Sequence, residues 1–189
     1  MKLQPITNNF HYTEALTRFA RAFGAARSGD STFAEKEVEQ LARLRDALKA
    51  AKNEYWATEV EVSGLVASAW SALASGRKEE ALKMMRSAAD IEDKNEKHIV
   101  TPGRILPARE LLGQMLLELN RPADALKEFE ASQIREPNRF HGFAGAAQAA
   151  AQSGDSGKAK QYYTRLIDLA GAGSARPEVA RAKTFLAQR

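Results

Sequence analysis

The chain has 189 residues, of which 44% are hydrophobic and 28% are charged, a balance typical of a folded globular protein rather than a disordered or fibrous one. It contains no cysteine, which excludes disulfide bonds, thiolate nucleophiles and cysteine-ligated metal sites. The net charge of +4 is carried by stretches in which the signs alternate. This mixing disfavours nucleic acid as a partner, because a nucleic-acid interface normally carries a basic stripe with interleaved aromatic residues.

The sequence contains no segment that predicts membrane insertion. Residues 1–15 lack an apolar h-region, and no run of about 18 apolar residues occurs in the chain. We therefore expect a soluble protein with no membrane anchor, unless a leader was removed from a longer precursor. The compartment stays open between cytoplasm and periplasm.

Helix-favouring residues dominate the chain, and apolar residues recur at i, i+3, i+4 and i+7 in nearly every segment. Turn-like stretches at 27–31, 75–79, 119–123 and 153–157 separate the helical patterns. We expect helical hairpins over about 13–50, 54–93, 106–138 and 140–171. The stretch 94–105 contains Pro102 and Gly103 and predicts an ordered loop, whereas 175–188 predicts a final helix that caps the last hairpin.

The turns share a residue pattern when they are aligned on one Gly or Asn. An alanine stands five residues after that position, a small residue stands seven before it, and a larger apolar or aromatic residue stands nine after it. The turn residues are Gly29, Gly76, Asn120 and Gly154; the alanines are Ala34, Ala81, Ala125 and Ala159; the small residues are Ala22, Ala69, Gly113 and Ala147; the larger residues are Val38, Met85, Phe129 and Tyr163. Small residues on both sides of a turn let two antiparallel helices approach closely.

This spacing resembles the tetratricopeptide repeat, a helix–turn–helix unit of about 34 residues. The third copy matches best, with Leu112, Gly113, Ala125, Phe129 and Pro137 at signature positions. The resemblance implies an all-α, right-handed α-solenoid of about four hairpins with a C-terminal capping helix, forming one domain over residues 1–189.

The first two copies depart from the family pattern. Arg21 and Ser68 stand where the family prefers a large apolar residue, and neither copy has a closing proline. The stretch 96–140 is also similar to the C-terminal part of larger, mostly uncharacterised bacterial tetratricopeptide-repeat proteins. That similarity leaves open whether N-terminal repeats belong to this chain, and it implies a fold without implying an activity.

A catalytic or metal site would have to use His11, His98 or His141, the only histidines. None of them has a second histidine at i+3 or i+4, and no HExxH motif, phosphate loop or nucleophile elbow is present. We therefore expect no enzyme, cofactor or metal. A less favoured interpretation is an enzyme-associated domain with a site near His98 and His141.

Tetratricopeptide proteins bind peptides or helices in a concave groove lined by the first helix of each hairpin, and the resemblance implies such a groove here. Its N-terminal half would be apolar and its C-terminal half polar. The residues in register are Phe19, Phe23, Val66, Trp70, Leu73, Glu110, Gln114, His141 and Gln148. We expect a non-catalytic protein-interaction module or scaffold with Trp70 as anchor. The alternative is a self-associating C-terminal segment of a larger repeat protein, in which a second copy or neighbouring helices bury this face.

The loop supplies a second candidate site. His98, Thr101 and Arg104 would provide hydrogen-bond donors for an anionic or carboxylate group. The alternative is that these residues fasten the loop and start the next helix. In the groove itself, Glu110 would repel a terminal carboxylate, which disfavours the kind of repeat domain that grips the C-terminus of a chaperone.

Overall fold

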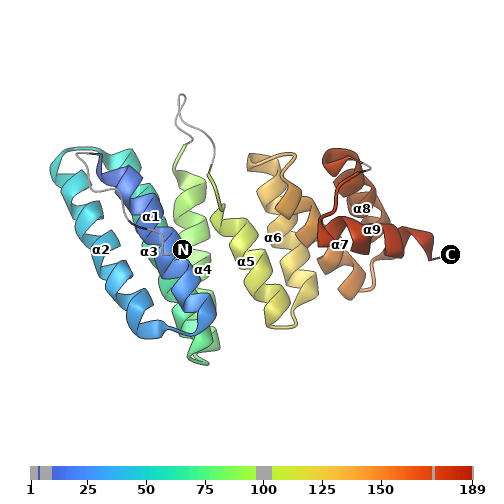
Figure 1. Ribbon diagram of the computed structural model, residues 1–189, viewed down its shortest axis with the longest axis horizontal. Helices are drawn as coiled ribbons and strands as arrows, with labels where there is room; N and C mark the ends of the chain where they lie inside the picture. Colours follow the sequence, from blue (N-terminus) through green and yellow to red (C-terminus); the bar gives the residue numbers. More distant parts are fainter. Residues whose placement is uncertain (1–3, 5–9, 97–103, 172, 189) are drawn as a thin grey trace. The chain divides into compact units, whose positions relative to one another are not determined.

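The computed structural model describes residue 4 and residues 10–96, 104–171 and 173–188, and the regular structure in these residues is entirely α-helical. Its helices are α1 (His11–Ser28), α2 (Ser31–Ala50), α3 (Glu54–Ala74), α4 (Lys78–Lys94), α5 (Ala108–Glu118), α6 (Pro122–Arg135), α7 (Phe140–Gln152), α8 (Ser156–Ala170) and α9 (Pro177–Ala187) (Figure 1). The expected all-α fold of helical hairpins with a C-terminal helix is confirmed. The helices divide into two compact units, Met1–Gly103 and Arg104–Arg189. A single domain over the whole chain stays a prediction.

The N-terminal unit consists of the hairpins α1–α2 and α3–α4. Helix α3 packs against α1, α2 and α4, so it is the central helix of the unit. Ala22, Ala34, Ala69 and Ala81 on these paired helices have no exposed surface. The small residues predicted from the turn spacing are therefore fully buried in the unit, as close packing of the helices requires.

The C-terminal unit consists of the hairpins α5–α6 and α7–α8, with α6 packed against α7 and α9 packed against α8. The ring of Phe129 on α6 fills the space beside α5 and α7. A Cβ added to Gly113 would lie 2.8 Å from this ring, and one added to Gly145 would lie 2.2 Å from it. Helix α9 caps the unit by burying Val179 and Ala182 and by placing the ring of Phe185 5.0 Å from that of Tyr163.

Each hairpin turn contains one residue in the left-handed region. The φ angles are 84° at Gly29, 80° at Gly76, 57° at Asn120 and 84° at Gly154. The next backbone N–H bonds back to a carbonyl of the first helix, as from Asp155 to Ala150 at 2.9 Å, which satisfies an otherwise unpaired group of the helix end. This explains why Gly or Asn recurs at these positions in the sequence.

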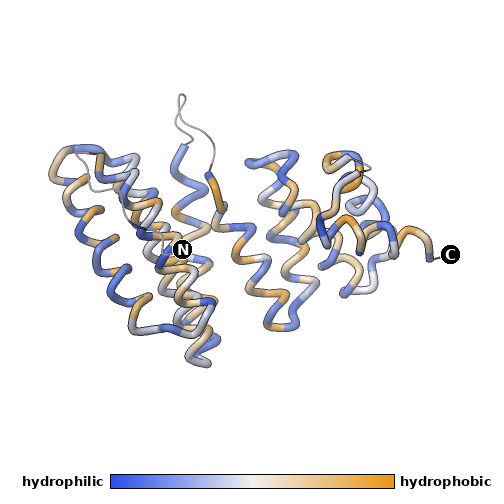
Figure 2. Tube along the Cα trace, in the orientation of Figure 1, coloured by the Kyte–Doolittle hydropathy of each residue, from blue (hydrophilic) through white to orange (hydrophobic). Residues whose placement is uncertain are grey.

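Figure 2 shows polar and apolar residues interspersed along the helices. In the described parts of the chain, none of the helices combines the length and the hydropathy that a membrane span needs.

Candidate partner-binding site

The structure brings together three of the residues predicted to line the N-terminal half of the groove. The rings of Phe19 and Phe23 on α1 are stacked with centroids 5.7 Å apart. Phe23 in turn meets Trp70 on α3 edge to face at 5.5 Å. The guanidinium of Arg27 lies 4.4 Å above the Trp70 ring, a cation–π contact that covers part of the indole.

These residues lie at different depths. Trp70 is 3% exposed and Val66 is 1% exposed, whereas Phe19, Phe23 and Leu73 are partly exposed. Leu16 lies one helical turn before Phe19 on the same side of α1 and is 46% exposed. We call Leu16, Phe19, Phe23 and Leu73 the aromatic face, with Trp70 as its floor. A partner could therefore touch the four face residues directly, but not Trp70.

Burial leaves one polar atom of the floor unsatisfied. The indole Nε1 of Trp70 has no hydrogen-bond partner among the described residues. A buried N–H without an acceptor costs about 1–3 kcal/mol, so Trp70 is held in place by packing and not by a hydrogen bond.

The predicted polar residues of the C-terminal unit also lie at different depths. Gln114 and Gln148 are partly exposed and His141 is exposed. Glu110 is 5% exposed, and its Oε1 accepts a 2.7 Å hydrogen bond from Nε of Arg139. Burial raises the pKa of Glu110, and the neighbouring Arg139 opposes that rise without cancelling it. Glu110 therefore points into the unit, and the three other side chains are the accessible ones.

Of the loop candidates, the structure describes only Arg104, because His98 and Thr101 lie outside the described residues. The side chain of Arg104 is 8% exposed and forms an ion pair of 3.7 Å with Glu136, whose side chain is 7% exposed. The Arg104 carbonyl accepts a hydrogen bond from Arg139 at 3.0 Å. This arrangement fastens Arg104 to the C-terminal unit, and its role in binding an anion stays a prediction.

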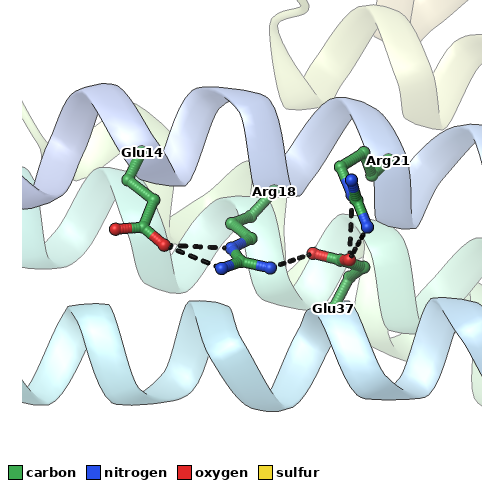
Figure 3. A network of polar contacts seen from close by, with 4 residues as sticks. All are labelled: Glu14, Arg18, Arg21 and Glu37. Carbon is green, nitrogen blue, oxygen red and sulfur yellow. Dashed lines mark hydrogen bonds and ion pairs between the residues drawn. The ribbon is translucent and has the colours of Figure 1, made fainter. Parts of the chain in front are cut away.

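A charge network that the sequence did not reveal joins α1 to α2 (Figure 3). Glu37 on α2 is 3% exposed, and its two oxygens accept from Arg21 at 2.8 Å and from Arg18 at 3.2 Å. Arg18 also bonds to Glu14 at 2.9 Å. The hint in the sequence was Arg21 at a position where the family has a large apolar residue, because a buried arginine requires an acid nearby.

The histidine and acidic side chains do not form a metal-binding cluster in the described residues. Among the residues that the structure describes, no group of three or more His, Asp or Glu side chains is placed to hold a metal ion. His141 is exposed and its ring lies beside that of Phe140, with centroids 5.8 Å apart. Of the predicted groove residues, those that are accessible are thus apolar on the N-terminal unit and polar on the C-terminal unit.

Comparisons with known proteins agree with the fold. Residues 143–172 match the family described as tetratricopeptide repeat. No curated protein matches the sequence significantly. The crystal structure of PcrH from Pseudomonas aeruginosa is similar with a TM-score of 0.51 and 20% sequence identity, over 67% of this chain and 89% of that chain. At this identity the similarity concerns the fold alone. The chain therefore contains a tetratricopeptide repeat within an all-α fold of tetratricopeptide-like hairpins.

Proposed function

We propose that this protein binds a peptide or helix of a partner protein on the aromatic face of its N-terminal unit, without catalysing a reaction. The observation that carries the proposal is the cluster of Phe19, Phe23 and Trp70, of which two rings reach the surface and one forms the floor. Aromatic side chains beside a buried floor are the groups that most often dominate the energy of a protein interface.

The geometry favours a ligand that places apolar side chains at regular intervals. Leu16, Phe19 and Phe23 follow one another at i, i+3 and i+7, so they form one stripe along α1. Leu73 lies on the same side of α3 as Trp70, three residues further along the helix. An amphipathic helix or a short apolar peptide could pack its side chains against these four residues.

The floor supports the face by fixing its shape. Phe23 cannot move far without losing its contact with Trp70, and the guanidinium of Arg27 lies over the Trp70 ring. A face that is rigid before binding loses less conformational entropy when the partner arrives.

A second copy of the chain is the competing occupant. The same apolar residues would be buried in a homodimer, in line with the self-association alternative. Light scattering coupled to size exclusion over about a hundredfold concentration range separates the two cases, because only self-association raises the mass with concentration. A mass that stays at 20.7 kDa leaves the face open for another protein.

The direct test uses random peptides displayed on phage and selected on the full chain. Leu16→Glu should lower the affinity for the selected peptides by at least about tenfold, because it places a charge on a surface that must be desolvated. Ile134→Glu is the matched control, since Ile134 is 84% exposed on α6 in the other unit. Circular dichroism should show unchanged helicity in both variants. Equal peptide binding by the two variants would refute the proposed site.

A further inference from the structure

Arg139, at the N-cap position of α7, donates hydrogen bonds to three acceptors in the C-terminal unit. Its Nε donates to Oε1 of Glu110 at 2.7 Å, its Nη1 donates to the carbonyl of Arg104 at 3.0 Å, and its Nη2 donates to the carbonyl of Ile105 at 2.8 Å. The planar guanidinium can serve all three at once because its donors point outward in a fixed fork. Arg139 therefore joins α5, α7 and the residues before α5.

Residues 104–107, which we call the strap, lead directly into α5. Apolar burial holds only part of the strap, because Pro107 is buried whereas Ile105 is 69% exposed. At its other end the strap is held by polar contacts that include the bonds from Arg139 and the ion pair of Arg104 with Glu136. Loss of the bonds from Arg139 would weaken the attachment of Arg104 and Ile105 to the C-terminal unit.

Glu110 is the side chain that accepts the Nε hydrogen bond of Arg139. Its surroundings are Arg139 and His141 from α7 and Glu136 from the end of α6, and Arg104 of the strap pairs with Glu136. A Cβ added to Gly142 in the first turn of α7 would lie 3.2 Å from Oε1 of Glu110. The carboxylate thus sits against the positive end of the α7 dipole, where an acid is favoured, and no acidic residue of α7 itself occupies its first turn.

We propose that Arg139 and Glu110 form a latch that holds the strap on the C-terminal unit, and that the equilibrium between closed and open strap depends on the charge of Glu110. In the open strap, Arg139 loses its two carbonyl acceptors and water reaches the carboxylate. The latch is a conformational device of this unit alone and is independent of the aromatic face.

The sign of the pH dependence follows from the burial of Glu110. In the closed latch burial raises the pKa of Glu110, with His141 and Arg139 opposing the rise and Glu136 adding to it. In the open latch the solvated carboxyl has its ordinary pKa, so the closed latch binds the proton more tightly. Acidification from neutral pH towards that ordinary value therefore tightens the latch, and neutral pH is where it opens most.

The test is hydrogen exchange of the strap amides in the full chain, measured by mass spectrometry between about pH 7 and about pH 5 and corrected for intrinsic exchange. In the wild type, strap protection should increase as the pH falls. Glu110→Gln keeps an acceptor for Arg139 but removes the charge, so its strap should be protected at both pH values and its profile should be flat.

Arg139→Lys tests the hydrogen-bond fork separately, because lysine keeps the positive charge beside Glu110 but cannot serve three fixed acceptors. The strap amides of this variant should exchange about tenfold faster, because losing one hydrogen bond from a charged group raises the equilibrium constant for strap opening by about that factor. Arg109→Gln is the matched control: it removes an ion pair of 2.6 Å with Glu128 in the same unit and should leave strap exchange unchanged.

Three outcomes would overturn the latch. One is a strap that exchanges equally fast in Arg139→Lys and Arg109→Gln. Another is a Glu110→Gln profile that runs parallel to that of the wild type. The third is wild-type protection that falls with acidification, which would mean that the ion pair outweighs the burial of Glu110.

Discussion

Glu37 on α2, which is 3% exposed, accepts a 2.8 Å hydrogen bond from Nε of Arg21 on α1. The arginine occupies a position where the tetratricopeptide pattern calls for a large apolar residue, and the buried acid compensates for its charge. The first hairpin is therefore held together in part by an ion pair between α1 and α2. The guanidinium of Arg21 also lies 5.0 Å from the ring of Phe33, which adds a cation–π contact within the same hairpin.

Glu37→Gln should destabilise the N-terminal unit by about 1–3 kcal/mol, because Arg18 and Arg21 lose the carboxylate that neutralises them but stay partly solvated. Urea unfolding followed by tryptophan fluorescence measures the change. Replacing both partners, in Arg21→Leu with Glu37→Leu, should recover most of the loss, because an apolar pair needs no compensation. A double variant less stable than Glu37→Gln would contradict this account.

Trp70→Glu should unfold the N-terminal unit or cost at least about 3 kcal/mol, since it would place a charge at a site that is 3% exposed and lined by Phe23. This substitution is therefore unsuitable as a test of partner binding. Trp56→Glu is the comparison, because Trp56 is on the same helix and partly exposed, stacked on Tyr12 at 4.2 Å. Far-ultraviolet circular dichroism and thermal melting should show the smaller loss for Trp56→Glu.

Gly145→Ala should destabilise the C-terminal unit by about 1–3 kcal/mol, because the new methyl group would collide with the Phe129 ring. Gly64→Ala is the opposite case: a Cβ at that position of α3 meets nothing within 4 Å, so the variant should gain about 0.5–1 kcal/mol of helix propensity. Thermal melting of the two variants should move in opposite directions. A Gly145→Ala protein as stable as the wild type would show that Phe129 can move aside.

Tyr162 provides a prediction at alkaline pH. Its hydroxyl donates to Oε1 of Glu130 at 2.9 Å, and partial burial together with that acid raises the pKa of Tyr162 to about 12. Because the folded state holds the proton more tightly, the stability from this contact is complete below a pH of about 10 and is lost as the pH rises towards 12. Absorbance of the phenolate should reveal the late titration.

The matched variants for Tyr162 lie on α6. Glu130→Gln should move the titration of Tyr162 to lower pH, because the negative charge beside the hydroxyl is gone. Glu128→Gln, which removes the acid paired with Arg109, should leave it unchanged. A titration of Tyr162 that does not respond to Glu130→Gln would assign the shift to burial alone.

The hairpins were predictable from the sequence because their determinants are local. Gly29, Gly76, Asn120 and Gly154 have the positive φ that the turn requires, and this requirement restricts the residue type strongly. Alanines such as Ala125 and Ala159 lie where paired helices touch, so their spacing from the turn is fixed by helix geometry. The turn residue and the alanine that follows it are present even in the first two hairpins, which lack the closing proline.

The depth of the site residues was not predictable in this way. Helical register assigned Trp70 and Phe23 to one face, and they do touch, but Trp70 is buried because Phe23 and Arg27 cover it. Register likewise assigned Glu110 to the groove, whereas Arg139 holds it inside the unit. Such outcomes depend on neighbours from other helices, about which periodicity along one helix carries no information.

The role of Arg139 was not predictable because this residue lies in the short polar connection between α6 and α7. Its partners Glu110 and Ile105 are 29 and 34 positions earlier in the chain. Only folding brings them together. An arginine directly before a helix with no acid in its first turn was the signal available, and it is a weak one.

The two tryptophans of the chain, Trp56 and Trp70, both belong to α3. Tryptophan fluorescence, excited at a wavelength that tyrosine does not absorb, therefore reports on the N-terminal unit, whereas circular dichroism reports on the helices of both units. Denaturation recorded with both methods should give coincident curves only if the units unfold together. A difference between the two unfolding midpoints would show that the C-terminal unit unfolds independently of the N-terminal unit, without a label or a truncated chain.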